Sequence, residues 1–169
     1  MRKTDYYIFE PITPDLAKDF LMFLSELDGL KDKVINVYIN SPGGCLDSGF
    51  AMINGIQRSK HKIRTIGIGG IASAAFMILM SGDERHLYHN ALCMSHQYSW
   101  GTGGKHHELE ASAKAFEIVD KSVLAIYRDA SKLPISKIKK ELLPANDVYL
   151  TPEQVLKYKL VDKILKKGE

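Results

Sequence analysis

The stretch Val34-Ile35-Asn36-Val37-Tyr38-Ile39-Asn40-Ser41-Pro42-Gly43-Gly44 decides the fold class of this chain. Its first part is rich in β-branched and aromatic residues, which is typical of a buried strand. Asn40 to Gly44 then predicts a tight turn, because proline fixes φ and glycine tolerates backbone conformations that other residues avoid. A buried strand that ends in such a turn is what the first half of a βαβ unit requires.

The alternation of strand and helix continues on both sides of this stretch. Upstream, residues 6–9 predict a short strand, and Thr13-Pro14-Asp15 predicts the start of a helix. Downstream, the apolar spacing predicts a helix over residues 46–58, a strand over 63–68 and a helix over 72–80 that begins just after Gly69-Gly70. This order favours parallel strands joined by right-handed crossovers.

The C-terminal half contains the longest helical pattern. We expect a helix from Lys105 to near Ala130, after the glycine-rich residues 101–104. Its apolar stripe is longer than so small a domain needs for its own core, so we expect it to be buried between subunits. The stripe consists of Leu109, Phe116, Val119, Val123 and Ile126. The remaining pattern predicts extended pieces at 86–88 and 92–94, helices at 135–142 and from 152, and a last strand around 160–165.

Length and composition limit the function classes. The 169 residues, 45% of them hydrophobic, are enough for a single domain that spans residues 1–169. With 23 basic and 20 acidic residues the formal charge is only +3, which indicates no nucleic-acid partner. Glycine and serine interrupt the uncharged stretch from Thr65 to Gly82, so it predicts a buried strand and helix and no membrane span.

Cysteine usage and the N-terminus bear on the compartment. Cys45 and Cys93 lie far apart, and residues 1–5 contain no apolar secretory segment. We therefore expect two reduced thiols in a cytoplasmic protein, with a disulfide between them as the alternative.

Ser73 is the first candidate for chemistry. It lies between a predicted buried strand and a predicted buried helix, and its neighbours are small, so little crowds its hydroxyl. At the start of a helix, a serine oxygen and an oxyanion beside it would be close to unsatisfied backbone N–H groups. A helix-capping or tightly packed structural serine is the competing interpretation.

The turn Ser41-Pro42-Gly43-Gly44 is a second candidate, because its glycines let the backbone approach a ligand closely. It would supply half of an oxyanion hole, or it is an ordinary turn between a strand and a helix.

His96 is the candidate general base, since it follows an apolar strand. Five other histidines compete with it, so position alone does not select it. His106-His107-Glu108 lacks a third ligand at a suitable spacing, so we expect a solvated helix start and no metal site.

Three ordered motifs together resemble the ClpP peptidase family, the proteolytic subunits of Clp proteases. They are Tyr38-Ile39-Asn40-Ser41-Pro42-Gly43-Gly44, then Gly70-Ile71-Ala72-Ser73-Ala74-Ala75-Phe76, then Met94-Ser95-His96-Gln97. The C-terminal stretches 150–153 and 158–162 also resemble the end of that family's sequences, and the resemblance covers the chain from about Tyr7.

The resemblance implies a serine endopeptidase with a Ser-His-Asp triad. Ser73 would be the nucleophile, His96 the base and Asp147 the orienting carboxylate. The backbone N–H groups of Gly44 and Ala74 would form the oxyanion hole, with Gly43 shaping the turn. Ser73 is not in a G-x-S-x-G elbow, which disfavours an α/β-hydrolase.

The resemblance also implies a fold and partners. The fold would be the α/β spiral of βαβ units that ClpP shares with the crotonases, with a projecting handle at about residues 97–130. Two stacked rings of this subunit would enclose a chamber for unfolded polypeptides, with no cofactor and with ATP used only by a possible AAA+ unfoldase. The chain begins almost at its first strand, so we expect it to lack the family's N-terminal axial segment, which helps that family engage its unfoldase.

Two residues depart from the family pattern. Tyr98 stands where the family usually has proline, and Lys159 where it usually has glycine.

Two rival functions remain at this stage. A crotonase-type acyl-CoA enzyme would share the spiral but would need no Ser73–His96 pair. An inactive scaffold subunit would keep the handle and hydrolyse nothing alone.

Overall fold

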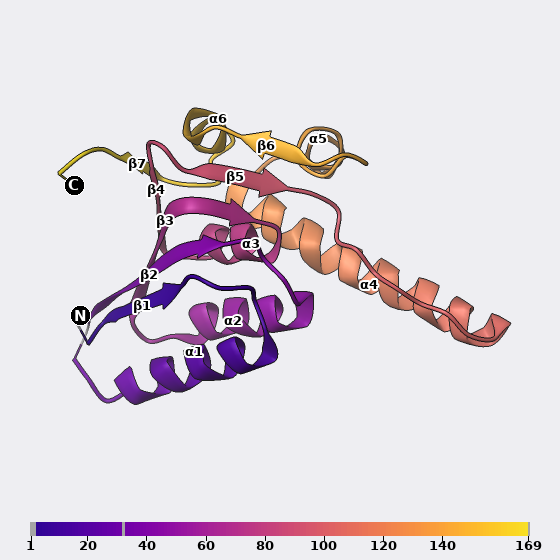
Figure 1. Cartoon of the computed structure of the whole chain (residues 1–169), viewed down its shortest axis with the longest axis horizontal. Helices are drawn as coiled ribbons and strands as arrows, with labels where there is room; N and C mark the ends of the chain where they lie inside the picture. The colour runs from indigo at the N-terminus through magenta and orange to yellow at the C-terminus, as the bar shows by residue number, and fades with distance from the viewer. Residues whose placement is uncertain (1–2, 32, 169) are drawn as a thin grey trace.

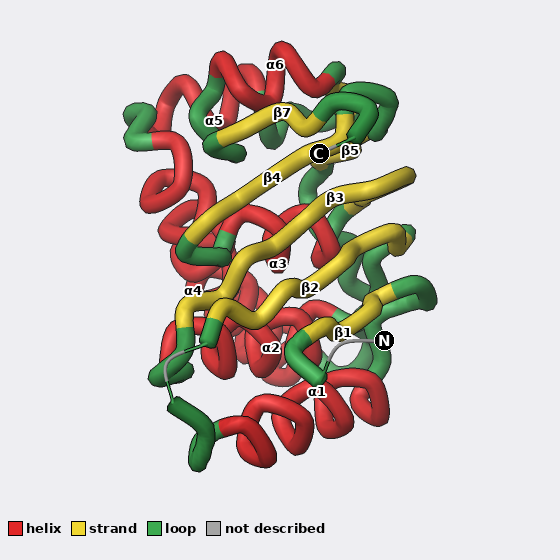
Figure 2. Tube along the Cα trace, turned by 90° about the vertical axis from the view of Figure 1, so that its left-hand side faces the viewer, coloured by secondary structure: helices red, strands yellow, loops and turns green. Residues whose placement is uncertain are grey.

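A seven-stranded sheet forms the centre of the protein, whose computed structural model describes residues 3–31 and 33–168 (Figures 1 and 2). The strand order is β1-β2-β3-β4-β7, and β5 pairs with both β3 and β6. The strands are β1 (Asp5–Ile8), β2 (Val34–Ser41), β3 (Lys62–Ala72), β4 (Glu84–Tyr88), β5 (Leu92–Ser95), β6 (Val148–Leu150) and β7 (Lys163–Leu165). The helices are α1 (Pro14–Leu27), α2 (Leu46–Arg58), α3 (Ala74–Met80), α4 (His106–Ser131), α5 (Ile135–Glu141) and α6 (Pro152–Lys157).

The predicted parallel pairing is confirmed for the first strands. β1 pairs with β2, β2 with β3 and β3 with β4, all in parallel. In β2, Ile35, Val37 and Ile39 are fully buried, as their apolar character predicts. Helices α2 and α3 lie behind the sheet in Figure 2, so the alternation of strand and helix produces a layered α/β fold.

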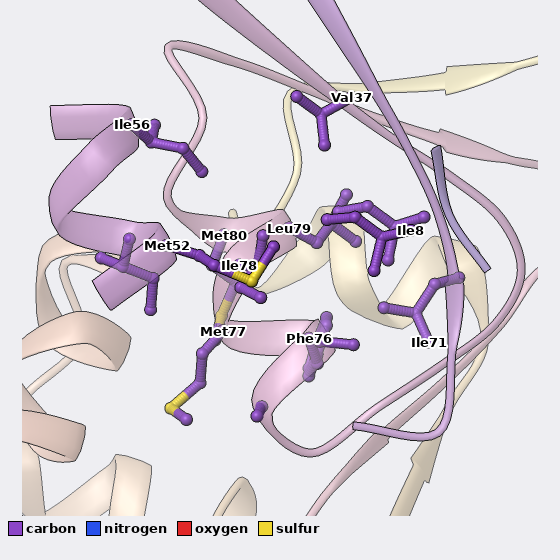
Figure 3. Close-up of a cluster of buried hydrophobic side chains, with 14 of the residues drawn as sticks. Ile8, Val37, Met52, Ile56, Ile71, Phe76, Met77, Ile78, Leu79 and Met80 are labelled. Carbon is purple, nitrogen blue, oxygen red and sulfur yellow. The ribbon is translucent and has the colours of Figure 1, made fainter. Parts of the chain in front are cut away.

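Helix α3 is enclosed in the core (Figure 3). Phe76, Ile78 and Leu79 are fully buried, and Met77 and Met80 nearly so. The uncharged stretch predicted to be a strand and a helix is therefore the centre of the molecule. In the described parts of the chain, no helix has the length and apolar character needed to cross a membrane.

Helix α4 confirms the long helix expected over residues 105–130. Its C-terminal half packs on α3, where the Tyr127 and Phe76 rings meet edge to face with centroids 6.5 Å apart. Its N-terminal half projects away from the sheet (Figure 1). Along the predicted stripe, Val123 is buried, whereas Leu109 at the projecting end is exposed.

The predicted elements differ most from the structure at the junction of β3 and α3, at β6 and at β7. β3 continues to Ala72 and α3 begins only at Ala74, because the residues after Gly69 pair with β5 instead of turning. β6 was not predicted, since three residues that pair only with β5 carry no periodicity. β7 begins at Lys163, because the backbone N–H groups of Leu160 and Asp162 are used in turn contacts with Val155 and Arg85.

Lys159 explains part of that turn. Its φ is 58°, a left-handed conformation that favours glycine. The residue that departs from the ClpP-like pattern is therefore held in the conformation that a glycine would adopt without strain.

The packing of α1 provides a test of this core. We expect Leu24→Ala to lower the free energy of unfolding by about 2–5 kcal/mol, because the Leu24 side chain is buried and its removal leaves a cavity. Met22→Ala on the same helix should change it by less than about 0.5 kcal/mol, because Met22 is 53% exposed. Chemical denaturation of both variants at one protein concentration measures the difference, and equal losses would contradict the packing described for α1.

Candidate active site

Ser73 occupies a strained connection between β3 and α3. Its φ and ψ are 55° and −126°, which a residue with a side chain rarely adopts. The Ser73 N–H donates to the Met94 carbonyl at 3.0 Å, and the Ser73 carbonyl accepts from the N–H of Phe76 at 3.0 Å and of Met77 at 3.2 Å. These bonds hold the backbone in place, and strain of this kind is characteristic of functional positions.

His96 lies beside Ser73 because of the pairing between β3 and β5. The two strands run parallel with Ala72 opposite Met94, so their carboxyl ends meet at the same edge of the sheet. The His96 Nε2 and Ser73 Oγ atoms are 2.7 Å apart, a hydrogen-bond distance. This is the arrangement that a base needs in order to take the serine proton.

Asp147 reaches the same place through a different strand pair. β6 is antiparallel to β5, with Ser95 opposite Val148. One step along each strand, the same register sets Asp147 opposite His96. The distance between Asp147 Oδ1 and His96 Nδ1 is 3.7 Å, which is an ion-pair distance and longer than a hydrogen bond. The structure thus brings all three sequence-predicted side chains together, with Asp147 the most loosely held.

The glycine turn lies directly against Ser73. A Cβ added to Gly43 would come within 2.7 Å of the Ser73 Cβ and 3.0 Å of the Ala74 nitrogen. Ile12 clamps the turn, because its N–H donates to the Gly43 carbonyl and its carbonyl accepts from the Cys45 N–H. This clamp leaves the Gly44 N–H out, and Ala74, as the first residue of α3, has no partner for its own N–H within the helix. Ala74 directly follows Ser73, and Gly44 lies in the wall of the cavity that Ser73 also lines.

A cavity of about 380 Å³ opens over Ser73 and His96. Its walls come from four elements and include Cys45, Met77, Met94 and Tyr127. A neighbouring cavity of about 570 Å³ is lined by Tyr98, Trp100 and Phe116, but neither Ser73 nor His96 lines it. Tyr98 lines both cavities, so the two lie next to each other.

The other histidines do not form a competing site. His61 is buried and bonds to the Leu27 carbonyl at 2.7 Å, so its role is structural. His106 is an exposed residue at the start of α4, as predicted, 3.7 Å from Glu110. Across residues 3–31 and 33–168, no three histidine, cysteine, aspartate or glutamate side chains come together as a metal site would require.

The two cysteines are free thiols in different surroundings. Cys93 is fully buried, and desolvation raises its pKa to about 12. Cys45 is exposed in the cavity wall, and hydrogen bonds from the Ser48 side chain and backbone lower its pKa. The sequence predicts two thiols but does not indicate that one of them faces the candidate site. The position of Cys45 directly after Gly44 is the sequence feature that could have indicated this.

The comparison with known families decides where this fold belongs. A model of the Clp protease family matches residues 1–168. The chain belongs to the Clp protease family. The mixed α/β architecture with its mostly parallel sheet agrees with this assignment, so the resemblance drawn from the sequence motifs is confirmed.

Membership in the Clp protease family supports a peptidase activity in general terms. Clp proteases form oligomeric rings, work with unfoldases and need no cofactor. The Ser73–His96 pair and the cavity above it are where such an activity would be sought in this member of the family.

The position of Cys45 in the cavity wall can be tested with a thiol reagent. We expect N-ethylmaleimide to modify Cys45 and to leave the buried Cys93 untouched in the folded protein. Because the Cys45 pKa is lowered, its thiolate should persist to a lower pH than that of an ordinary cysteine, and labelling should extend to correspondingly lower pH. Mass spectrometry of the labelled protein across pH measures this, with Cys45→Ser as the unlabelled control. Preferential labelling of Cys93 would contradict the assignment.

Proposed function

We propose that this protein is a serine endopeptidase that cleaves unfolded polypeptides with the triad Ser73, His96 and Asp147. The observation that carries the proposal is the 2.7 Å contact between His96 Nε2 and Ser73 Oγ at a strained serine. The Clp protease family match supports the same chemistry.

The first half of the mechanism is acylation. His96 Nε2 accepts the Ser73 proton as Oγ attacks the scissile carbonyl, and the N–H groups of Gly44 and Ala74 stabilise the oxyanion. The C–N bond then breaks, and protonated His96 gives its proton to the leaving amine. An ester joins Ser73 to the acyl fragment.

The second half regenerates the enzyme. Water gives a proton to His96 Nε2 and attacks the ester carbonyl, and the returned proton restores the Ser73 hydroxyl as the carboxylic acid leaves. Asp147 accepts from the Nδ1–H of His96 and stabilises the imidazolium. In this mechanism Asp147 Oδ1 moves closer to His96 Nδ1 than its present 3.7 Å, because catalytic hydrogen bonds often tighten only when substrate binds.

The shape of the chain supports the proposed assembly. We place residues 1–169 in one peptidase domain and residues 97–130 in a handle, whose helix α4 projects from the sheet with Leu109 and Ile118 exposed. The handle would join two stacked rings, and an AAA+ unfoldase would supply unfolded substrate.

The alternatives account for less of the site. A crotonase-type enzyme would polarise a thioester with backbone N–H groups and would leave the Ser73–His96 contact without a purpose. An inactive scaffold subunit would need neither the contact nor the strain at Ser73.

Removal of the Ser73 hydroxyl tests the nucleophile. We expect Ser73→Ala to abolish hydrolysis of a fluorogenic peptide and labelling by a fluorophosphonate probe, because one oxygen carries both reactions. Circular dichroism should show an unchanged fold. Wild-type turnover by this variant would refute the proposal, and an unlabelled wild-type protein would favour the acyl-CoA or scaffold alternatives.

The base and the carboxylate require their own variants. We expect His96→Ala and Asp147→Asn each to lower kcat by roughly 10³ or more, because both residues support the same proton transfer. Steady-state kinetics on the purified proteins measures this. A silent Asp147→Asn would show that another group, or none, orients His96.

A further inference from the structure

A buried chain of hydroxyl groups connects helix α4 to the segment that carries Asp147. Ser95 Oγ is 2.6 Å from the Tyr127 hydroxyl and 2.5 Å from the Leu142 carbonyl oxygen. A carbonyl only accepts, so the single Ser95 proton goes to Leu142. The Tyr127 hydroxyl must therefore donate to Ser95 Oγ, so both hydrogen bonds run in the direction Tyr127 to Ser95 to Leu142.

These two hydrogen bonds lie close in sequence to both His96 and Asp147. Ser95 directly precedes His96, and Leu142 lies five residues before Asp147 at the C-terminal end of α5. Gln97, on the other side of His96, donates from Nε2 to the Leu143 carbonyl at 3.0 Å. Ser95 and Gln97, which flank His96, thus donate to two consecutive carbonyls of the segment that leads to Asp147.

Burial makes the contact costly to disrupt. Ser95 and Leu142 are fully buried, and Tyr127 is 2% exposed. Water cannot replace a lost partner at such a place, so each hydroxyl depends on the other. Asp147, by contrast, has a side chain that is 53% exposed, and it lies between two anchors, the contacts of Leu142 and Leu143 on one side and the pairing of β6 with β5 on the other.

We propose that Tyr127 and Ser95 are positioning residues that hold the Asp147 loop within reach of His96. This inference rests on the proposed function. Neither residue touches the reacting atoms, and both act through the placement of Asp147. The sequence motifs do not indicate this role, because Tyr127 belongs to none of them and only follows Ile126, the last residue of the predicted apolar stripe.

The decisive variant is Tyr127→Phe, which deletes one oxygen and keeps the ring that packs on Phe76. We expect kcat to fall by about tenfold to a hundredfold with KM within about twofold, because a small misplacement of a catalytic group is costly while the cavity is preserved. Tyr6→Phe is the matched control, since Tyr6 also meets a phenylalanine edge to face, with ring centroids 5.1 Å apart, at a distance from the site. It should leave kcat unchanged.

A double-mutant cycle separates positioning from general loosening of the fold. If Tyr127 acts through Asp147, then Tyr127→Phe should cause no further loss of kcat in an Asp147→Asn background. Ser95→Ala should match or exceed the loss caused by Tyr127→Phe, and Ser131→Ala is its control. Ser131 is a buried serine on α4, the helix that carries Tyr127. Its hydroxyl donates to the Tyr127 backbone carbonyl and does not contact the Tyr127 hydroxyl.

Wild-type kcat in Tyr127→Phe, or a loss of the same factor with and without Asp147, would overturn the positioning role while the proposed peptidase stands. Absence of Ser73-dependent activity in the wild-type protein would instead overturn the proposed function, and the positioning role with it. A loss confined to the Asp147-containing background supports both.

Discussion

The parallel pairing of the end of β3 with β5 is the constraint on which the rest of the site depends. Gly70 to Ala72 lie opposite Leu92 to Met94, and the Ser73 N–H closes the pairing on the Met94 carbonyl. The serine and the histidine follow these strands directly, so their separation is set by backbone hydrogen bonds. Buried α3 beneath them fixes the position of the serine along the strand.

Much of this fold could be predicted from the sequence where a segment has a period and clear ends. Thr13 caps α1 as its residue type indicates, and its Oγ1 accepts from the Leu16 N–H at 3.2 Å. The predictions failed where pairing overrides local preference. Gly69 and Gly70 read as a turn, but the partner strand β5 keeps Gly70 extended. The short β6 exists only because β5 is beside it.

The residues of the candidate site also differ in how far the sequence alone predicts them. Ser73 and His96 could be singled out because small residues and a strand end surround them, although only the family resemblance chose His96 among the histidines. Asp147 was beyond local reasoning, since its place comes from the register of Ser95 with Val148. Tyr127 and Ser95 could not be found from the sequence, because a hydroxyl contact across 32 residues leaves no trace in spacing.

The backbone of Ser73 has a consequence for how such a protein can change. A residue with a side chain at φ 55° costs of the order of 1–3 kcal/mol relative to a relaxed one, and glycine would remove most of that cost. Selection for thermal stability alone would therefore favour replacement of Ser73 by glycine. A serine at this position keeps a hydroxyl beside His96 and lowers the stability of the fold, which is the compromise expected at a functional position.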